Sequence, residues 1–409
     1  MPEPKVRFKR DDGSSYPAWE RKRLGEITEQ VTLRNGMNDC YPVYSVNNQK
    51  GFIPQRDQFE EREVASADRT NYKVVAVNQF AYNPSRINVG SIAYLKENLS
   101  VIVSPLYVVF ECRNGLSERF LNEYVRTNYF HNQRRVHAEG SVRDSLSYDG
   151  FANIEMWLPC CEEQQCIIDF LASIDDVISF TEKEIVNLHV QKKDAMNKIF
   201  SKTVRFKRPD GNQFPEWEKI CLGDRFTFKN GVNASKEAFE LGGIKCIGVS
   251  DVYKCLPIKA ENVDGEVSLN NKDIERYSVN YGDVLFQRSS ETKIDIGRAS
   301  VYVDNTDAVF NGFVICAKPQ EMFYDPIFLH NALQTKSVRE QTIRLGAGAQ
   351  HFNIGQDGLA SISILFPCLE EQRLIADFLS DFDEAIAAAK KELELWKELK
   401  KGLLQQMFV

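Results

Sequence analysis

Apolar residues recur at alternating steps of three and four along two segments of the chain, one in the middle and one at the end. This spacing is typical of the seam of a coiled coil. Each segment starts just after a proline, Pro159 or Pro367, and has two glutamates in its first turn, where carboxylates complement the helix dipole. The seam positions are Leu171, Ile174, Ile178, Thr181, Ile185, Leu188, Lys192, Ala195 and Ile199 in the first segment, and Leu379, Phe382, Ile386, Ala389, Leu393, Trp396, Lys400, Leu403 and Met407 in the second.

The pattern predicts long helices over residues 161–203 and 368–409 that pair with each other as an antiparallel coiled coil. Both seams carry a lysine at the same place, Lys192 and Lys400. A lysine in a seam weakens a coiled coil but can fix its register or orientation. The alternative is that each helix packs only on its own domain, but two matched seams in one chain favour pairing.

The rest of the chain predicts globular parts of mixed α+β structure. Apolar runs rich in β-formers, bounded by Gly, Asn and Asp turns, occur at Lys73–Val77, Val101–Phe110 and Ala299–Val303. Helical stretches follow around Ser117–Tyr129 and Asp325–Glu340. The predicted fold class is therefore α+β, with two globular domains in pseudo-twofold repeat separated by the two long helices.

An internal duplication organises the chain. Val6–Gly25 matches Val204–Gly223, including the tryptophan of each, and Leu158–Leu171 matches Phe366–Leu379. The ends of the repeated unit match well in sequence, and its middle matches poorly. This pattern suits two copies of one structure that read different targets. The predicted segments are a first globular domain over 1–160, a helix over 161–203, a second globular domain over 204–367 and a C-terminal helix over 368–409.

Composition narrows the class of protein. With 409 residues, of which 43% are hydrophobic, the chain is long enough for two domains with connecting elements. Its charged start and the lack of an apolar run that could cross a bilayer predict a soluble, cytoplasmic protein. The ten cysteines include no Cys-x-x-Cys pair, so we expect neither a metal site nor a disulfide framework. The net charge of −7 falls mostly on the helical segments, so each domain can still present a basic face.

Taken together, the motifs resemble those of the specificity subunit of Type I restriction-modification enzymes. The features that carry the resemblance are the twin openings Tyr16–Glu20 and Phe214–Glu218, each followed by Leu-Gly, and the Pro-x-x-Glu-Glu-Gln helix starts at Pro159 and Pro367. Each motif alone is weak, but the set occurs twice and in order. The resemblance spans nearly the whole chain.

The resemblance implies a non-catalytic, DNA-binding subunit. Each domain would be a target-recognition domain that reads one half of a bipartite double-stranded DNA target. The paired helices would set the length of the unread spacer and dock two methyltransferase subunits, which methylate adenine at N6 with S-adenosylmethionine. Two further restriction or motor subunits would use ATP and Mg²⁺. The chain itself would hold no cofactor and no metal, and would have no catalytic residues.

Four polar loops are candidates for DNA contact, two in each domain. Sequence is read by Arg, Lys, Asn and Gln at base edges, and phosphates are held by basic and hydroxyl groups. For any single arginine, a solvated surface charge is an equally good interpretation. The candidates are Asn83, Arg86, Asn88, Arg134, Arg135, His137, Ser141 and Arg143 in the first domain, and Gln287, Arg288, Ser289, Ser290, Lys293, Arg344, Gln350, His351 and Asn353 in the second.

Trp19 and Trp217 could stack on bases. Their identical placement in the repeated frame favours a different role, a shared structural anchor that packs the start of each domain onto its core.

Other functions have less support. The spacing of Asp283, Glu291 and Lys293 weakly resembles a nuclease motif, but the first domain has no counterpart of these residues. The segments beginning at Asn83 and Asp325 contain only fragments of a methyltransferase Asn/Asp-Pro-Pro-aromatic motif, without a glycine-rich cofactor loop. Two alternatives stay open: a two-domain protein-binding scaffold, and a DNA-reading subunit of another modification or phage-defence system.

Overall fold

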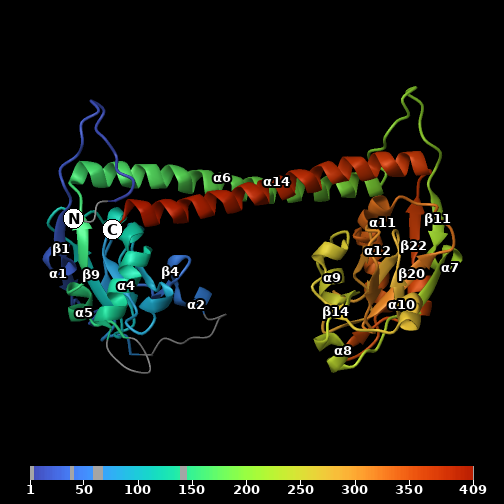
Figure 1. Ribbon diagram of the computed structural model, residues 1–409, viewed down its shortest axis with the longest axis horizontal. Coiled ribbons are helices and arrows are strands. Elements are labelled where there is room, and N and C mark those ends of the chain that lie inside the picture. Colours follow the sequence, from blue (N-terminus) through green and yellow to red (C-terminus); the bar gives the residue numbers. More distant parts are fainter. Residues whose placement is uncertain (1–3, 37–40, 59–67, 139–144, 409) are drawn as a thin grey trace. The chain divides into compact units, whose positions relative to one another are not determined.

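The structure is a computed structural model that describes residues 4–36, 41–58, 68–138 and 145–408. The chain forms two compact units: unit 1 comprises residues 1–182 and 391–409, and unit 2 comprises residues 183–390. Each unit contains one α+β globular part and a stretch of both long helices, α6 (Cys161–Phe200) and α14 (Leu369–Met407) (Figure 1). The predicted α+β class is confirmed, whereas the four segment boundaries given above stay a prediction.

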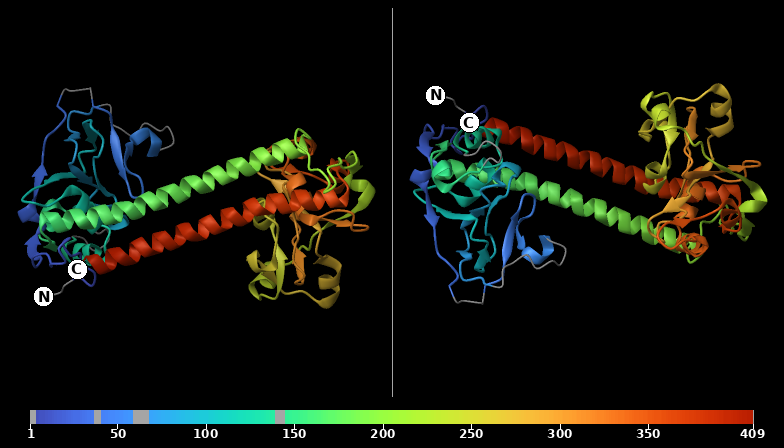
Figure 2. Two further views of the ribbon diagram at one scale, coloured as in Figure 1. Left: turned by 90° about the horizontal axis from the view of Figure 1, so that it is seen from above. Right: turned by 90° about the horizontal axis from the view of Figure 1, so that it is seen from below.

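The two long helices lie side by side and run in opposite directions (Figure 2). In unit 1, Leu171 near the start of α6 shares a hydrophobic core with Met407 at the end of α14. In unit 2, Ile199 at the end of α6 shares a core with Leu379 near the start of α14. Every predicted seam position is buried or half-buried. The antiparallel pairing predicted from the heptads is confirmed.

The seam lysines have carboxylate partners on the opposite helix. In unit 2, Lys192 Nζ lies 2.6 and 2.7 Å from the two carboxylate oxygens of Asp383. In unit 1, Lys400 Nζ lies 2.7 and 2.8 Å from those of Asp175. Asp175 and Asp383 occupy equivalent places in the repeat, so the two ion pairs are equivalent as well. Because a shifted register would leave the buried Lys400 and the half-buried Lys192 without their partners, the two pairs favour the observed alignment.

Unit 1 is built on a four-stranded sheet in the order β2-β9-β6-β7, to which β1-β10, β3-β4 and β5-β8 add antiparallel pairs. Its elements are β1 (Glu20–Arg23), α1 (Leu24–Ile27), β2 (Thr28–Val31), β3 (Tyr44–Asn47), β4 (Gly51–Pro54), α2 (Gln55–Gln58), β5 (Lys73–Val75), β6 (Phe80–Tyr82), η1 (Ile87–Val89), β7 (Ile92–Tyr94), β8 (Val101–Val103), β9 (Val108–Cys112), α3 (Glu118–Tyr124), α4 (Asn128–His137), α5 (Tyr148–Ala152) and β10 (Glu155–Leu158).

Unit 2 is built on two four-stranded sheets, β12-β20-β16-β18 and β14-β13-β19-β15, with the antiparallel pairs β11-β22 and β17-β21. Its elements are β11 (Glu218–Cys221), α7 (Leu222–Arg225), β12 (Phe226–Asn230), α8 (Lys236–Glu240), β13 (Ile244–Ile247), α9 (Val249–Tyr253), η2 (Ala260–Asn262), β14 (Glu266–Val267), α10 (Asn271–Tyr277), β15 (Ser278–Val279), β16 (Val284–Gln287), β17 (Ser289–Ser290), β18 (Ala299–Val301), β19 (Ala308–Phe310), β20 (Val314–Pro319), α11 (Pro326–Leu333), α12 (Lys336–Leu345), β21 (Phe352–Asn353), α13 (Gln356–Ala360) and β22 (Ser363–Phe366).

Three predicted elements are divided in the structure. The helical stretch predicted around Ser117–Tyr129 forms α3 and the start of α4, with a break between Tyr124 and Asn128. The apolar run Val101–Phe110 forms two strands, β8 and β9, because Pro105 between them has no N–H to donate to a ladder. The helical stretch predicted around Asp325–Glu340 forms α11 and α12, with a break at Gln334 and Thr335. Across the described ranges, no helix is long and apolar enough to span a membrane.

Candidate nucleic-acid interface

In unit 2 the two predicted polar loops meet. Strand β17 pairs with β21, so that Ser289 lies opposite Asn353. The backbone N–H of Ile354 also donates to the carbonyl oxygen of Arg288 at 3.0 Å. Segments that are far apart in the sequence therefore form one continuous surface. On it, Arg288 is exposed, and its guanidinium donates to the carbonyl oxygen of Gly312 at 3.3 Å.

The other predicted residues of unit 2 differ in exposure. Gln287 is buried, and its amide donates to the carbonyl oxygen of Ser289 at 2.9 Å, so it supports the segment from within. Arg344 lies in the last turn of α12, a favourable place for a cation. Ser289 and Ser290 are half-buried, and the exposed candidates are Lys293, Arg344, Gln350, His351 and Asn353.

In unit 1 the loop around Asn83 lies between β6 and η1. The Asn83 side-chain oxygen accepts from the backbone N–H of Ser85 at 3.1 Å, which closes a local turn. Asn83 is half-buried, whereas Arg86 and Asn88 are exposed. The N–H of Leu146 donates to the carbonyl oxygen of Pro84 at 3.2 Å. The chain that follows the second predicted loop therefore touches the first loop, as in unit 2.

The second predicted loop of unit 1 is a helix up to His137, which corrects the expectation of a flexible segment. Thr127 caps α4 by accepting from the N–H of Phe130 at 3.2 Å, and basic residues in the last turn complement the helix dipole. Arg134 is buried, Arg135 is exposed and His137 is half-buried. Similarly, Arg344 ends a helix rather than opening a loop. Ser141 and Arg143 lie outside the described residues.

One polar element was missed by the sequence reasoning. The hairpin β3-β4 turns through Asn48, Gln49 and Lys50, whose side chains are all exposed. Asn48 lines a cavity of about 360 Å³ together with Asn83 and Arg86. The signal was present as an Asn-Asn-Gln-Lys-Gly run between apolar residues, which is a turn pattern rich in base-reading side chains.

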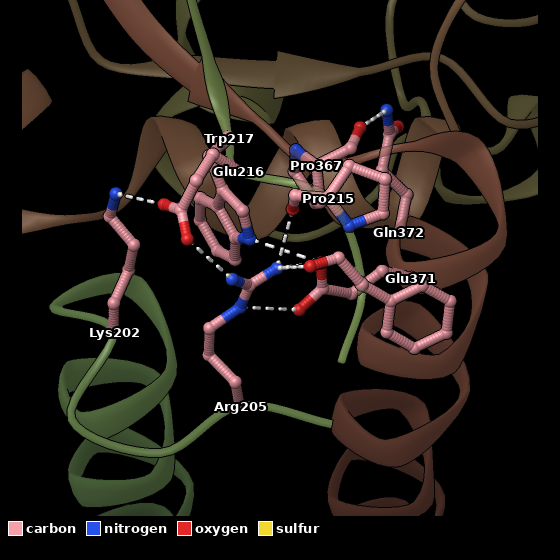
Figure 3. Close-up of polar contacts among 9 residues, drawn as sticks. Lys202, Arg205, Pro215, Glu216, Trp217, Pro367, Glu371 and Gln372 are labelled. Carbon is pink, nitrogen blue, oxygen red and sulfur yellow. Dashed lines mark hydrogen bonds and ion pairs between the residues drawn. The ribbon is translucent and has the colours of Figure 1, made fainter. Parts of the chain in front are cut away.

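The tryptophans are anchors, as expected. In unit 2, Arg205 donates from Nε and Nη2 to the Glu371 carboxylate at 3.2 and 2.8 Å, and Trp217 Nε1 donates to it at 3.1 Å (Figure 3). Glu371 is fully buried, and Trp217 is 6% exposed. The hydrogen bond to Glu371 raises the pKa of Arg205. A tryptophan held in this way is not available to stack on bases.

Unit 1 repeats this cluster. Arg7 donates to Glu163 at 3.0 and 2.8 Å, and Trp19 Nε1 donates to it at 2.9 Å. The glutamine that follows has a second shared role: the Gln164 side-chain oxygen accepts from the N–H of Ser117, as Gln372 accepts from that of Asp325, both at 2.9 Å. The Glu-Glu-Gln motif thus fastens the start of each long helix to its own globular part.

The three residues whose spacing weakly resembles a nuclease motif either have other partners or are exposed. Asp283 is buried and forms an ion pair with Lys318 at 2.7 Å. Burial raises the pKa of Asp283, and the hydrogen bond from Lys318 opposes that rise. Glu291 and Lys293 are exposed. Over the ranges that the structure describes, no group of three His, Cys, Asp or Glu side chains could hold a metal ion.

Known proteins share sequence similarity with this chain. Residues 215–395 match the Type I restriction modification DNA specificity domain. The chain is 26% identical over 220 residues to the putative type I restriction enzyme MjaX specificity subunit of Methanocaldococcus jannaschii, covering 51% of this chain and 49% of that protein. It is 24% identical over 334 residues to the MjaVIII specificity subunit of the same organism, covering 75% of this chain and 70% of that protein. The chain thus spans about half the length of the first relative.

Solved structures show the same fold. The S subunit of a Type I restriction-modification system from M. genitalium superposes with a TM-score of 0.52 at 14% identity, over 100% of this chain and 99% of that one. A chain from a structural study of complex assembly and conformational transition in the type I R-M system gives a TM-score of 0.58 at 18% identity, over 96% and 97%. The chain therefore has the fold of these solved structures, and its residues 215–395 are similar to the Type I restriction modification DNA specificity domain.

Proposed function

We propose that this chain reads a bipartite double-stranded DNA target, with unit 1 recognising one half and unit 2 the other, and that it catalyses nothing itself. The observation that carries the proposal is the joining of two polar segments in unit 2 through β17 and β21. In and beside these segments, Arg288, Arg344 and Gln350 are exposed, and they are side-chain types that contact base edges and phosphates. A similar junction in unit 1 is built from a different sequence, which suits a different half-site.

We propose further that the paired helices set the spacer between the two half-sites and dock two methyltransferase subunits. Half-sites read on one face of DNA lie about 34–36 Å apart or multiples of that distance, and a stiff helix pair holds a spacing that a flexible linker cannot. In unit 1 the helices expose Phe180, Leu395 and Leu399, and exposed apolar side chains suit a protein partner. S-adenosylmethionine would be bound by the methyltransferase partners, and ATP and Mg²⁺ by two restriction or motor subunits.

Loss of Arg288 tests the reading surface. We expect Arg288→Ala to weaken binding to the selected DNA site by about 1–3 kcal/mol and to relax its specificity in one half-site. Arg143→Ala is expected to do the same in the other half-site. Binding is measured by gel shift with the full chain. Arg373→Ala, which removes an exposed charge from α14, is the matched control and leaves the specificity unchanged.

The same titration separates DNA reading from a protein-binding scaffold. Binding that releases counterions from many phosphates weakens steeply as salt rises, whereas an apolar protein interface does not. Unchanged affinity and specificity in both arginine variants would refute the assignment of these residues. The absence of any salt-dependent DNA binding by the wild-type chain would refute the function.

Lengthening both helices tests whether the helix pair sets the spacer between the half-sites. One heptad inserted in α6 after Glu182 and one in α14 after Lys390 extends the paired helices by about 10 Å, or roughly three base pairs. We expect both half-sites to be retained and the preferred spacer to lengthen, as read by methylation mapping of host DNA. A heptad inserted at the exposed turn of Gly211 is the control. An unchanged spacer in the helix variant would contradict the proposal.

A further inference from the structure

The tip of the β3-β4 hairpin in unit 1 presents side chains that its own fold does not use. The Asn47 side-chain oxygen accepts from the backbone N–H groups of Gln49 and Lys50 at 2.8 and 3.0 Å, and so satisfies the turn. Gly51, with a φ of +69°, closes the turn in the left-handed region that glycine favours. The amides of Asn48 and Gln49 and the ammonium of Lys50 extend from this turn as exposed groups.

The hairpin is fixed to the neighbouring polar loop. Ser91 Oγ donates to the carbonyl oxygen of Val46 at 2.9 Å, and the N–H of Val46 donates to the hydroxyl of Tyr107 at 3.4 Å. Ser91 ends the loop that contains Asn83 and Arg86. The base of the hairpin is therefore held at a set place beside Arg86, and the tip does not depend on a flexible linker for its position.

Polar cavities lie on both sides of the tip. The first, of about 360 Å³, is lined by residues of the hairpin and of the loop, including Asn47, Asn48, Asn83 and Arg86. The second, of about 230 Å³, is lined by Gln49 and Lys50 together with residues that include Lys96 and Arg126. Within the described part of unit 1, no side-chain hydrogen bond or ion pair engages Arg86, Asn48 or Gln49. These donors are free for an outside partner.

The chemistry of these groups matches a DNA base edge. An Asn or Gln amide offers one donor and one acceptor side by side, which pairs with N7 and N6 of adenine in the major groove. An arginine or lysine pairs with O6 and N7 of guanine or with a phosphate. A two-stranded β-ribbon also fits the major groove, which is about 12 Å wide. The tip therefore combines a suitable shape with suitable donors.

We infer that the tip Asn48–Lys50, together with Arg86, is a base-reading element of unit 1, and that the amides of Asn48 and Gln49 recognise adenine. Lys50 holds a phosphate, and Arg86 contacts a guanine or a phosphate from the opposite wall of the first cavity. The inference rests on the proposed reading of duplex DNA and adds the residues and the base class for one half-site.

Unit 2 has no such tip at the corresponding place, which explains how one frame can read two sequences. In unit 1, Val43 forms a parallel bridge with Ile102 of β8, just before the hairpin. In unit 2, β13 runs parallel to β19, and the chain then enters the short helix α9 instead of a second strand. Asp251 stabilises the start of α9 by accepting a hydrogen bond from the N–H of Gly248 at 2.9 Å.

The test is a selection of binding sites from a randomised duplex DNA library by the full chain. We expect the double variant Asn48→Ala and Gln49→Ala to lose preference for adenine in one half-site by about ten-fold to a hundred-fold, while the other half-site is unchanged. Lys50→Ala is expected to lower affinity for all sequences and to leave the selected motif intact. Gln30→Ala, an exposed glutamine of β2 in the same unit, is the matched control.

The outcomes separate this inference from the proposed function. If the wild-type chain selects a bipartite motif and the double variant selects the same motif, the tip does not read bases and the inference is overturned, while the proposed function stands. A change that Gln30→Ala also produces would overturn it equally. If the wild-type chain selects no DNA sequence, the proposed function fails and the inference with it. Matching thermal unfolding of the variants and the wild type excludes misfolding as the cause.

Discussion

Replacing Glu371 with alanine lowers the free energy of unfolding of unit 2 by about 3–5 kcal/mol, the usual cost of removing one partner from a buried ion pair. Glu371 is fully buried and accepts hydrogen bonds from both Arg205 and Trp217. Without the carboxylate, the half-buried guanidinium and the buried indole N–H lose their shared acceptor. The measurement is urea-induced unfolding of the full chain.

A second glutamate, Glu216, contacts Arg205 from the surface and provides a control for the Glu371 substitution. Glu216 lies 3.3 Å from Arg205 and has a side chain that is 80% exposed, so Glu216→Ala is expected to cost no more than about 1 kcal/mol. Glu163→Ala is expected to weaken unit 1 by an amount similar to that for Glu371→Ala in unit 2. Equal, small effects at Glu371 and Glu216 would show that the buried cluster does not fasten the helix to its domain.

Mild acid is expected to weaken unit 2, because of His330. This side chain is buried in α11, with Nδ1 3.3 Å from Ser300 Oγ. Burial, aided by the charge of Lys192, lowers the pKa of His330 to about 3. An unfolded histidine has a pKa of about 6.5. The unfolded state therefore binds a proton that the folded state does not, and stability is lost as the pH falls below 6.5. At pH 5 the loss is about 2 kcal/mol.

The repeat provides the control for this prediction. Asn122 holds the same place in α3 of unit 1 and is buried without a titrating group. His330→Asn should therefore abolish most of the difference in stability between pH 7 and pH 5. The raised pKa of Asp283 acts in the opposite direction, since it stabilises unit 2 as the pH falls, but it is common to both proteins and cancels in the comparison. An identical pH dependence in the variant and the wild type would contradict the assignment to His330.

The candidate site was predictable only in part. The arginines at positions 288 and 86 identified their segments as candidates for DNA contact. Whether each polar side chain of these segments is exposed depends on the surrounding fold. Gln287 and Arg134 have the same donor chemistry as their neighbours and are buried. The hairpin tip at Asn48 was missed because short polar turns are common and nothing local shows that two cavities flank this one. Tertiary contacts such as the hydrogen bond from Ser91 to Val46 and the pairing of β17 with β21 bring these distant segments together.

The sequence by itself determined the helices, their antiparallel pairing and the repeat, because heptad spacing and a matched frame are local patterns that persist along the chain. It also marked Trp19 and Trp217 as anchors through their repeated placement. The tertiary structure alone decided which buried acceptors hold those anchors, which donors face outward, and how β3-β4 and α9 replace one another in the two units. These features depend on contacts between residues far apart in sequence, and the free energy of each such contact depends on burial, which no local pattern specifies.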